Sequence, residues 1–303
     1  MQTLAVIIVS WQVRDLLRRC LKVLREDLDR TSVDAQVWVV DNASKDGSAA
    51  MVREHFPWVH LKTPDENLGF VRGNNLVLER LLAEEIPDLI WLLNPDTEVQ
   101  SGATAALMNF FARHPRAGLV GPKLLNTDGS LQQSAFRFPG LLQPAFDLIN
   151  LPARLYETHL NGRYPEYQYA KGLPFPVDHP LGAAMMARGE AVKEIGPLDE
   201  DFFMYCEEID WAWRMREAGW EIWLVPNAEV IHHGGASTGQ ARPQTTAHLW
   251  ESRARLYRKH RGPLLRALVA TLVRYRFGHG KASTPEWERA YRRIVEAWQG
   301  KRA

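Results

Sequence analysis

Cysteine is scarce in this chain of 303 residues, which contains only Cys20 and Cys206. Cys20 lies among apolar residues with helical spacing, so we interpret it as a core side chain. The sequence therefore lacks both the cysteine pairs of a disulfide framework and the closely spaced cysteines of a zinc site. A reducing compartment fits this composition.

Long apolar runs are also missing. No segment approaches the roughly 18 apolar residues that a membrane span takes, and residues 1–10 have no basic leader before their apolar run. The sequence thus predicts neither a secretion signal nor a membrane span, and we expect a cytoplasmic protein. With 46% hydrophobic and 24% charged residues, the chain is long enough for one large or two modest globular domains.

The phosphate-binding glycine motifs are absent too. No Gly-x-Gly-x-x-Gly follows the first apolar run, and the chain has no Walker loop. These absences argue against the usual dinucleotide-binding and P-loop classes. A bound nucleotide would have to be held by other residues.

What the sequence does contain is a series of short apolar runs at 4–9, 37–40, 58–61 and 89–93, separated by stretches with helical spacing. This alternation predicts an α/β fold with an open, twisted, mostly parallel sheet flanked by helices. In such sheets ligands bind beyond the carboxyl ends of the strands. Asp41 follows the second run and Asp96 follows the fourth, so both are predicted at that edge.

The tetrapeptide Asn94-Pro95-Asp96-Thr97 ends the fourth run abruptly. Pro95 cannot donate to a strand ladder, so Asn94 and Asp96 would project from a corner of the backbone. A divalent cation held by a carboxylate and by substrate phosphates suits this corner. The alternative is a turn that ends the strand and caps the next helix.

A second acidic group is Glu207, Glu208 and Asp210, at the start of a helix predicted over 207–218 and ended by Gly219. Like charges and apolar neighbours raise the pKa of at least one such carboxyl, as a general base requires. The alternative is a helix start with solvated carboxylates.

The pair His232-His233 precedes a loop of Gly, Ala, Ser and Thr. At the end of a predicted strand, a neutral imidazole can bind a metal and a ring N–H can donate to phosphate. A structural histidine is the alternative.

Together these segments resemble the family 2 glycosyltransferases of GT-A fold, in particular their bacterial rhamnosyltransferase-like branch. The match covers about residues 4–238. The motifs that carry it, in chain order, are Val40-Asp41-Asn42-Ala43-Ser44 with Asp46-Gly47-Ser48, Asn67-x-Gly69-Phe70 with Gly73-Asn74-Asn75, Leu93-Asn94-Pro95-Asp96-Thr97, Gly196-Pro197-Leu198-Asp199-Glu200-x-Phe202-Phe203-Met204-Tyr205-x-Glu207-Glu208-x-Asp210 with Arg214 and Gly219, and His232-His233-Gly234-Gly235-Ala236-Ser237.

The resemblance implies a donor site for a nucleoside-diphosphate sugar linked to UDP or dTDP. Asp41 would accept a hydrogen bond from the imide N–H of uracil or thymine, because a carboxylate only accepts. The loop of residues 67–75 would lie beside the nucleoside. The residues implied for nucleotide-sugar binding are Ser10, Asp41, Asn42, Asn67, Gly69, Phe70, Arg72, Asn75, Asn94 and Asp96.

The resemblance also assigns a metal site and a base. Asp96 would bind Mg²⁺ or Mn²⁺ at the diphosphate together with His232, for which His233 is the alternative. Asn94 stands where relatives have an aspartate. Glu208 matches the family's base, Asp210 competes with it, and Glu207 would orient acceptor hydroxyls.

The C-terminal part differs from the rest in charge. Residues 241–303 hold 15 Lys and Arg against 4 Asp and Glu, whereas residues 1–240 hold 22 against 32. We expect a glycosyltransferase domain over 1–240, with a nucleotide-sugar half to about 125 and an acceptor half from about 126, and a basic helical extension over 241–303. A nucleic-acid partner is not expected, because no pattern of base-stacking aromatics accompanies the charge.

An apolar stripe runs through the extension. It is flanked by arginines, so it is suited to an anionic membrane surface on the inner face of the cytoplasmic membrane. Packing on the enzyme itself or on a second copy of the chain is the alternative. A further helix is predicted to start at Thr284. The stripe comprises Leu264, Leu265, Leu268, Val269, Leu272 and Val273.

The leading hypothesis is an inverting, metal-dependent glycosyltransferase that moves a sugar, with L-rhamnose as a candidate, to a growing surface glycan or lipid-linked acceptor. One alternative is a sugar nucleotidyltransferase, which the missing N-terminal glycine-rich, basic phosphate loop disfavours. The other is a carbohydrate-binding relative without activity.

Overall fold

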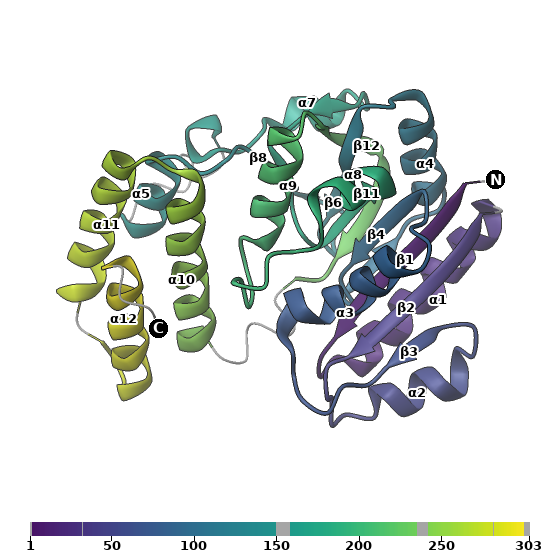
Figure 1. Ribbon diagram of the computed structural model, residues 1–303, viewed down its shortest axis with the longest axis horizontal. Coiled ribbons are helices and arrows are strands. Elements are labelled where there is room, and N and C mark those ends of the chain that lie inside the picture. Colours follow the sequence, from purple (N-terminus) through teal and green to yellow (C-terminus); the bar gives the residue numbers. More distant parts are fainter. Residues whose placement is uncertain (1, 32, 150–157, 235–241, 281, 300–303) are drawn as a thin grey trace.

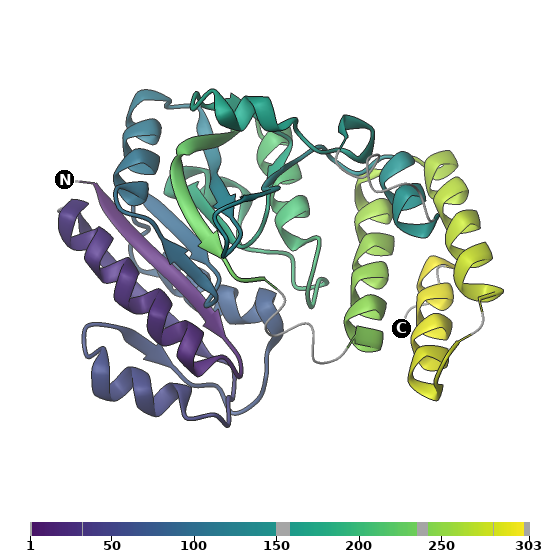
Figure 2. The ribbon, with the colours of Figure 1, turned by 180° about the vertical axis from the view of Figure 1, so that it is seen from behind.

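The computed structural model describes residues 2–31, 33–149, 158–234, 242–280 and 282–299. They form a central sheet covered by helices on both faces, with a helical lobe beside it (Figures 1 and 2). The strands are β1 Thr3–Ser10, β2 Asp34–Asp41, β3 His60–Lys62, β4 Leu89–Leu93, β5 Thr97–Val99, β6 Ala117–Leu125, β7 Leu131–Gln132, β8 Ala135–Phe136, β9 Phe175–Pro176, β10 His179–Pro180, β11 Ala184–Arg188 and β12 Glu221–His232. The helices are α1 Arg14–Thr31, α2 Ser48–His55, α3 Gly69–Ala83, α4 Ala103–Arg113, α5 Leu142–Leu148, the short 3₁₀ helix η1 His159–Asn161, α7 Glu166–Ala170, α8 Gly189–Ile195, α9 Glu207–Glu217, α10 Arg242–His260, α11 Pro263–Gly278 and α12 Pro285–Trp298.

The central sheet runs in the order β3-β2-β1-β4-β11-β6-β12-β5. Strands β3, β2, β1 and β4 are parallel, and so are β6 and β12. Strand β11 runs antiparallel to β4 and β6, and β5 runs antiparallel to β12. The predicted open, mostly parallel sheet with flanking helices is confirmed, with these antiparallel strands as an addition.

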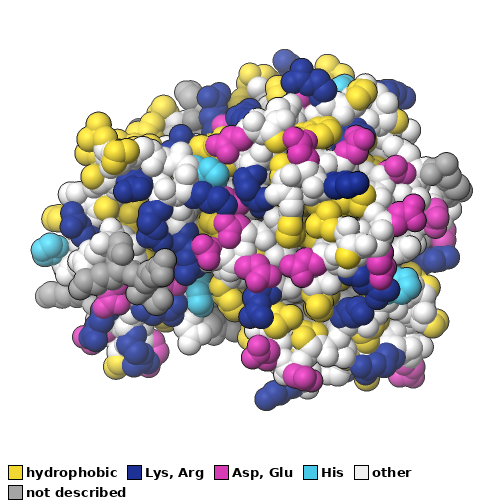
Figure 3. Space-filling model, viewed as in Figure 1, with side chains coloured by type: hydrophobic (Ala, Val, Ile, Leu, Met, Phe, Trp, Pro, Cys, Tyr) yellow, Lys and Arg dark blue, Asp and Glu magenta, His cyan; other side chains and the backbone are white. Residues whose placement is uncertain are grey.

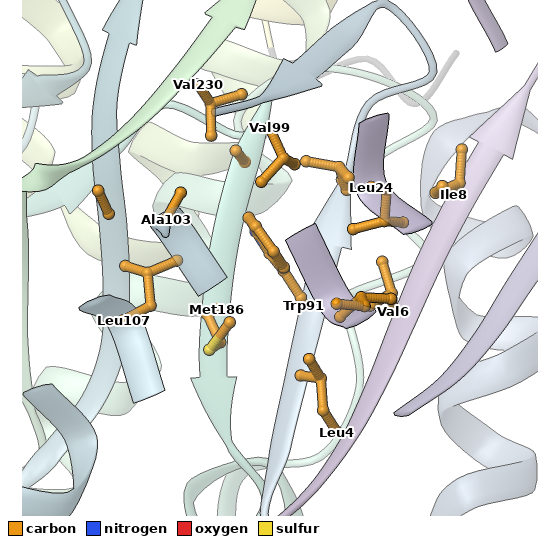
Figure 4. Close-up of a cluster of buried hydrophobic side chains, with 14 of the residues drawn as sticks. Leu4, Val6, Ile8, Leu24, Trp91, Val99, Ala103, Leu107, Met186 and Val230 are labelled. Carbon is orange, nitrogen blue, oxygen red and sulfur yellow. The ribbon is translucent and has the colours of Figure 1, made fainter. Parts of the chain in front are cut away.

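The strands that carry the site are buried on both faces. All five residues of β4 are buried, and seven of the eight in β1 are buried as well. One face packs Trp91 of β4 and Val6 of β1 against Leu24 of α1 (Figure 4). Continuous apolar runs are typical of parallel strands covered by helices. This burial makes the strand ends a rigid edge.

Helix α1 shows how the packing also satisfies polar groups. Its apolar positions recur with helical spacing and face the sheet, as does Cys20, which is fully buried. Asp27 lies on the same buried side, where its carboxylate accepts hydrogen bonds from the backbone N–H groups of Gly102 and Thr104. It therefore caps the first turn of α4, which has no side-chain cap of its own.

The last three helices form a lobe with its own apolar cluster. Trp250 of α10, Val269 of α11 and Ile294 of α12 belong to this cluster, whereas Leu256 of α10 belongs to the core on the sheet. Helix α12 begins as expected, because the Thr284 hydroxyl accepts a hydrogen bond from the N–H of Trp287. Since α10 packs in both clusters, a domain boundary at residue 240 remains a proposal.

No helix within the described ranges is both long enough and apolar enough to cross a membrane.

Candidate active site

The ends of β1 and β2 place two polar side chains next to each other. Ser10 and Asp41 are register partners, and they are 1% and 2% exposed. Ser10 Oγ and Asp41 Oδ1 are both buried without a hydrogen-bond partner among the described residues. Burial raises the pKa of Asp41. Unpartnered buried acceptors are costly, so this pair indicates a place where a ligand donor fits.

The asparagines beside this pair hold loops together. The Asn42 amide donates to Gly69 O at 2.9 Å and accepts from Leu68 N at 3.2 Å. Asn75 donates to Leu198 O at 2.8 Å and accepts from Leu198 N at 3.1 Å. Both amides therefore position loops at this edge of the sheet, and their contacts to a nucleotide stay a prediction.

The remaining residues of the glycine and asparagine loop surround the start of α3. Asn67 accepts a hydrogen bond from Gly69 N at 2.9 Å. Gly69 has a φ of 76°, and a Cβ there would lie 2.7 Å from the ring of Phe203, so this position needs glycine. Phe70 is partly buried against the core and Arg72 is exposed on α3. The loop therefore brings the donor side of the sheet edge into contact with the segment before α9.

The turn after β4 is closed by its own residues. Thr97 Oγ1 donates to Asn94 O at 2.7 Å, while Asn94 N donates to Ala183 O at 2.8 Å. Asp96 is 8% exposed, and its backbone O accepts from His233 N at 2.9 Å. The turn is therefore attached both to β11 and to the end of β12.

Only one of the two histidines faces Asp96. His232 Nε2 lies 3.4 Å from Asp96 Oδ1, and His232 Nδ1 lies 2.7 Å from Gln132 Oε1. His233 instead contacts Glu98 at 2.6 Å. The structure thus separates His232, the predicted metal ligand, from its alternative His233.

The pair of Asp96 and His232 has the chemistry of a cation site. The Gln132 amide donates through Nε2 to Asn126, so its Oε1 faces His232 and accepts from Nδ1–H. With Nδ1 as the donor, His232 can present the Nε2 lone pair toward a carboxylate oxygen, and a cation between these two acceptors would stabilise both. The described residues hold no group of three or more such ligands, so substrate oxygens and water would complete the coordination.

Helix α9 begins with the acidic pair. Tyr205 and Cys206, directly before it, have φ values of 68° and 67°, which is strained backbone for residues other than glycine. The Ser252 hydroxyl of α10 donates to Met204 O at 2.8 Å and so supports this turn from outside. The strain is thus held by packing between α10 and the turn before α9.

The two glutamates have different acidities. Burial raises the pKa of Glu208 to about 7. Burial and the charge of Glu208 raise the pKa of Glu207 well above its ordinary value, and Glu207 Oε2 has no partner among the described residues. The shift favours the neutral form of Glu207, while Glu208 is poised to take up or release a proton near neutral pH.

The two acidic centres meet through the segment before β11. Glu208 packs on Gly182, where a Cβ would lie 3.4 Å from its Cβ and Cγ. The next residue, Ala183, accepts the hydrogen bond from Asn94. The turn that carries Asp96 and the helix start that carries Glu208 therefore contact neighbouring residues, Ala183 and Gly182.

Asp210 is fully buried and contacts three basic side chains. Its carboxylate lies 2.8 Å from Arg214, 2.8 Å from Lys259 and 2.7 Å from His260. The hydrogen bonds from His260 and Lys259, with the charge of Arg214, outweigh burial and lower the pKa of Asp210 to about 2. A carboxylate with a pKa this low accepts protons poorly. The structure therefore favours a role for Asp210 in holding α9 against α10 rather than as the base.

Asp210→Asn is expected to destabilise the protein by about 3 kcal/mol at pH 7, because it removes the buried anion that pairs with Arg214 and Lys259. The lowered pKa stabilises the fold above about pH 4 and is lost as the pH falls toward 2, so wild type and variant should converge there. Denaturant unfolding at several pH values measures this. The control Asp199→Asn also removes a partner of Lys259, at 2.6 Å but with a side chain 26% exposed, and should cost much less. Full stability with lost activity in Asp210→Asn would make Asp210 a catalytic residue.

Sequence patterns did not reveal several residues of this site. Gln132 lies in a short strand 100 positions before His232, and Ser252 and Lys259 lie on the helix assigned to the extension. No local motif marks them, because their partners are distant in the chain. Of the last motif, Gly235, Ala236 and Ser237 lie outside the described residues.

The chain is similar in sequence to known glycosyltransferases. The family description "Glycosyl transferase family 2" matches residues 5–196. The chain is 30% identical over 246 residues, 78% of each chain, to N-acetylglucosaminyl-diphospho-decaprenol L-rhamnosyltransferase of Mycobacterium tuberculosis. It is 29% identical over 216 residues, 67% of this chain and 61% of the relative, to the low-salt glycan biosynthesis hexosyltransferase Agl10 of Haloferax volcanii.

Solved structures resemble the fold. The mannosyltransferase PcManGT from Pyrobaculum calidifontis, in complex with GDP-Man and Mn²⁺, superimposes with a TM-score of 0.57 at 15% identity, over 98% of this chain and 86% of that one. The predicted GT-A fold is thereby confirmed.

Proposed function

This chain belongs to glycosyl transferase family 2, and from that premise we propose that the edge of its sheet transfers one sugar from a nucleoside diphosphate to an acceptor hydroxyl with inversion at the anomeric carbon. The observation that carries the proposal is that the turn with Asp96 contacts Ala183 while Glu208 packs on the adjacent Gly182. A single in-line displacement needs a base at one end of the sugar and charge stabilisation at the other. The comparisons do not favour the nucleotidyltransferase or the inactive relative.

The donor base is proposed to sit on Asp41. Its unpartnered, buried Oδ1 is an acceptor, and the N3–H of uracil or thymine is a matching donor. UDP- and dTDP-linked sugars follow from this match. The mycobacterial relative is named as an L-rhamnosyltransferase, which supports L-rhamnose as the sugar.

Asp96 and His232 are proposed to hold Mg²⁺ or Mn²⁺, with Gln132 orienting the imidazole. The bound cation would neutralise negative charge on the diphosphate leaving group. Mn²⁺ accompanies GDP-Man in the archaeal mannosyltransferase structure, which supports a divalent ion.

Glu208 is proposed as the base. With a pKa of about 7 it is partly ionised at neutral pH, and its carboxylate takes the proton of the acceptor hydroxyl as the oxygen attacks. The raised pKa of Glu207 next to it favours a carboxyl with an O–H to donate, which suits orientation of the acceptor.

The acceptor is proposed to be a lipid-linked glycan, since the mycobacterial relative is named for an acceptor on decaprenyl diphosphate. We retain the proposed division into a nucleotide-sugar half to about 125, an acceptor half to 240 and a basic extension. Contacts from α10 to the strained turn before α9 make the extension part of the acceptor side.

The proposed donor is tested by nucleotide binding. UDP or dTDP with Mn²⁺ is expected to raise the melting temperature, whereas GDP is not. At a nucleotide concentration of 100 times Kd, the folded state gains about 2.7 kcal/mol of stability. Asp41→Asn should weaken UDP or dTDP binding about 100-fold, because a buried N–H would then face an amide instead of an acceptor-only group. Calorimetric titration measures the affinity, and release of UDP or dTDP from the sugar donor measures activity.

The control is Asp65→Asn, an exposed carboxylate before the same loop, which should bind nucleotide like wild type. Stabilisation by GDP alone would refute the role given to Asp41. Absence of nucleotide release with UDP, dTDP and GDP sugars in the presence of Mg²⁺ or Mn²⁺ would refute the transferase.

A further inference from the structure

Helix α11 has two apolar sides. Its inner side packs Val269 and Val273, both fully buried, against the lobe. Its outer side exposes Leu264 by 75%, Leu268 by 46% and Tyr275 by 75%. At 3.6 residues per turn these three positions fall within about 40° of one another around the helix. The predicted stripe is therefore divided between the core and the surface.

The exposed side continues onto neighbouring elements. Helix α5 packs beside α11, and η1 packs beside α5. Of the twelve large apolar side chains that are exposed among the described residues, seven lie on these three elements or at their ends. They are Leu141, Leu142, Ile149, Leu160, Leu264, Leu268 and Tyr275. We call this set the α5–α11 face.

Figure 3 shows hydrophobic side chains gathered at the upper left of the molecule, over α5 and α11, with Lys and Arg side chains beside them. Such gathering is uncommon on a monomer that binds nothing.

The charged side chains of α11 all have one sign. The exposed Arg274 and Arg276 lie on opposite flanks of the apolar line, and α11 contains no Asp or Glu. The acid of α5, Asp147, is already paired with Arg253 at 2.6 Å. An apolar line between arginines matches a bilayer surface, where acyl chains lie beneath anionic headgroups. A two-fold contact between copies of this face would bring the same arginines together, so the charge disfavours a second copy.

We propose that the α5–α11 face binds the surface of an anionic lipid bilayer, with Leu264, Leu268 and Tyr275 entering the headgroup region and Arg274 and Arg276 contacting lipid phosphates. The face extends the proposed function, because an enzyme acting on a lipid-linked acceptor works at such a surface. Binding to lipid itself needs neither donor nor metal, so the two proposals fail separately.

The test is sedimentation of the full chain with vesicles of phosphatidylcholine alone or mixed with phosphatidylglycerol. Wild type is expected to bind the mixed vesicles, to bind phosphatidylcholine at least about tenfold more weakly, and to dissociate as salt increases. Arg274→Gln with Arg276→Gln should weaken binding about 25-fold, at about fivefold for each charge. Leu264→Gln with Leu268→Gln should weaken it at least about tenfold.

Matched controls lie elsewhere on the surface. Leu173→Gln removes an apolar side chain that is 66% exposed, and Arg18→Gln removes an exposed charge of α1, and both should bind vesicles like wild type. All the altered side chains are exposed, so melting temperatures and nucleotide binding should stay unchanged.

Equal binding to both vesicle types, no binding to mixed vesicles, or unaltered binding by the α11 variants would overturn the proposal. A dimer in sedimentation velocity that Leu264→Gln with Leu268→Gln dissociates would assign the face to a second copy instead. If the wild type binds no nucleotide, the proposed function is refuted, but the proposal that the α5–α11 face binds lipid is unaffected.

Discussion

Glu208→Gln is expected to lower kcat by about 10²- to 10⁴-fold, the usual contribution of a general base. The acceptor hydroxyl would lose the carboxylate that takes its proton, whereas the nucleotide, held at Asp41 and Asp96, would bind as before. Steady-state kinetics and calorimetric titration of the nucleotide separate these two effects.

The matched control is the neighbouring Glu207→Gln. Burial and the charge of Glu208 raise the pKa of Glu207 well above its ordinary value, which favours its neutral form, so an uncharged amide of the same shape should keep most of the activity. Equal losses in the two variants would refute the assignment of Glu208 as the base. So would full activity of Glu208→Gln.

The pH dependence of activity and of stability tests the role of Glu208 independently. Since the base acts when ionised, kcat/KM of the wild type should rise with pH and level off above about 7. The raised pKa also means that folding becomes less favourable as the pH rises from 4.5 to about 7, by about 3 kcal/mol in all. Glu208→Gln should therefore be more stable than wild type at pH 8 and lose that advantage near pH 4. Equal stability at pH 8 would contradict the raised pKa.

Asp96→Asn is expected to abolish the Mn²⁺-dependent part of nucleotide binding and to lower kcat at least about 10³-fold, which corresponds to about 4 kcal/mol. The variant replaces the anionic ligand opposite His232 Nε2 by a neutral amide. Titration of UDP or dTDP with and without Mn²⁺ measures the coupling between ion and nucleotide directly, without turnover.

The control for Asp96 is Glu98→Gln, two positions further on. Glu98 pairs with His233 at 2.6 Å and with Arg19 at 3.3 Å, away from the proposed ion. It should retain the Mn²⁺ effect in full. An Mn²⁺ effect that survives in Asp96→Asn, or one that disappears in Glu98→Gln, would move the ion to another set of ligands.

Much of this site was accessible from local patterns. The apolar runs that end at Asp41 and Asn94, and the cluster at Glu207, indicated strand ends and a helix start, and the structure has β2, β4 and α9 there. Such patterns indicate the local secondary structure and which of its residues are buried, because the periodicity of apolar side chains follows the helix or strand that carries them. The choice among neighbouring candidates could not be made in this way.

That choice depends on contacts between distant segments. Pairing of β5 with β12 turns His232 toward Asp96 and His233 toward Glu98. Helix α10 surrounds Asp210 with Lys259 and His260 and leaves Glu208 as the basic carboxyl.

By itself, the sequence determined the kind of sheet, the edge where the acids lie and the start of α12 at Thr284, because each follows from neighbours within a few positions. Only the tertiary structure decided that Asn75 clamps Leu198, that Gln132 orients His232 and that α11 buries Val269 while exposing Leu264. The first two join residues about a hundred or more positions apart, and the third depends on which side of α11 meets α10 and α12. These long-range contacts and the orientation of α11 arise only when the chain folds, so the periodicity of the sequence does not reveal them.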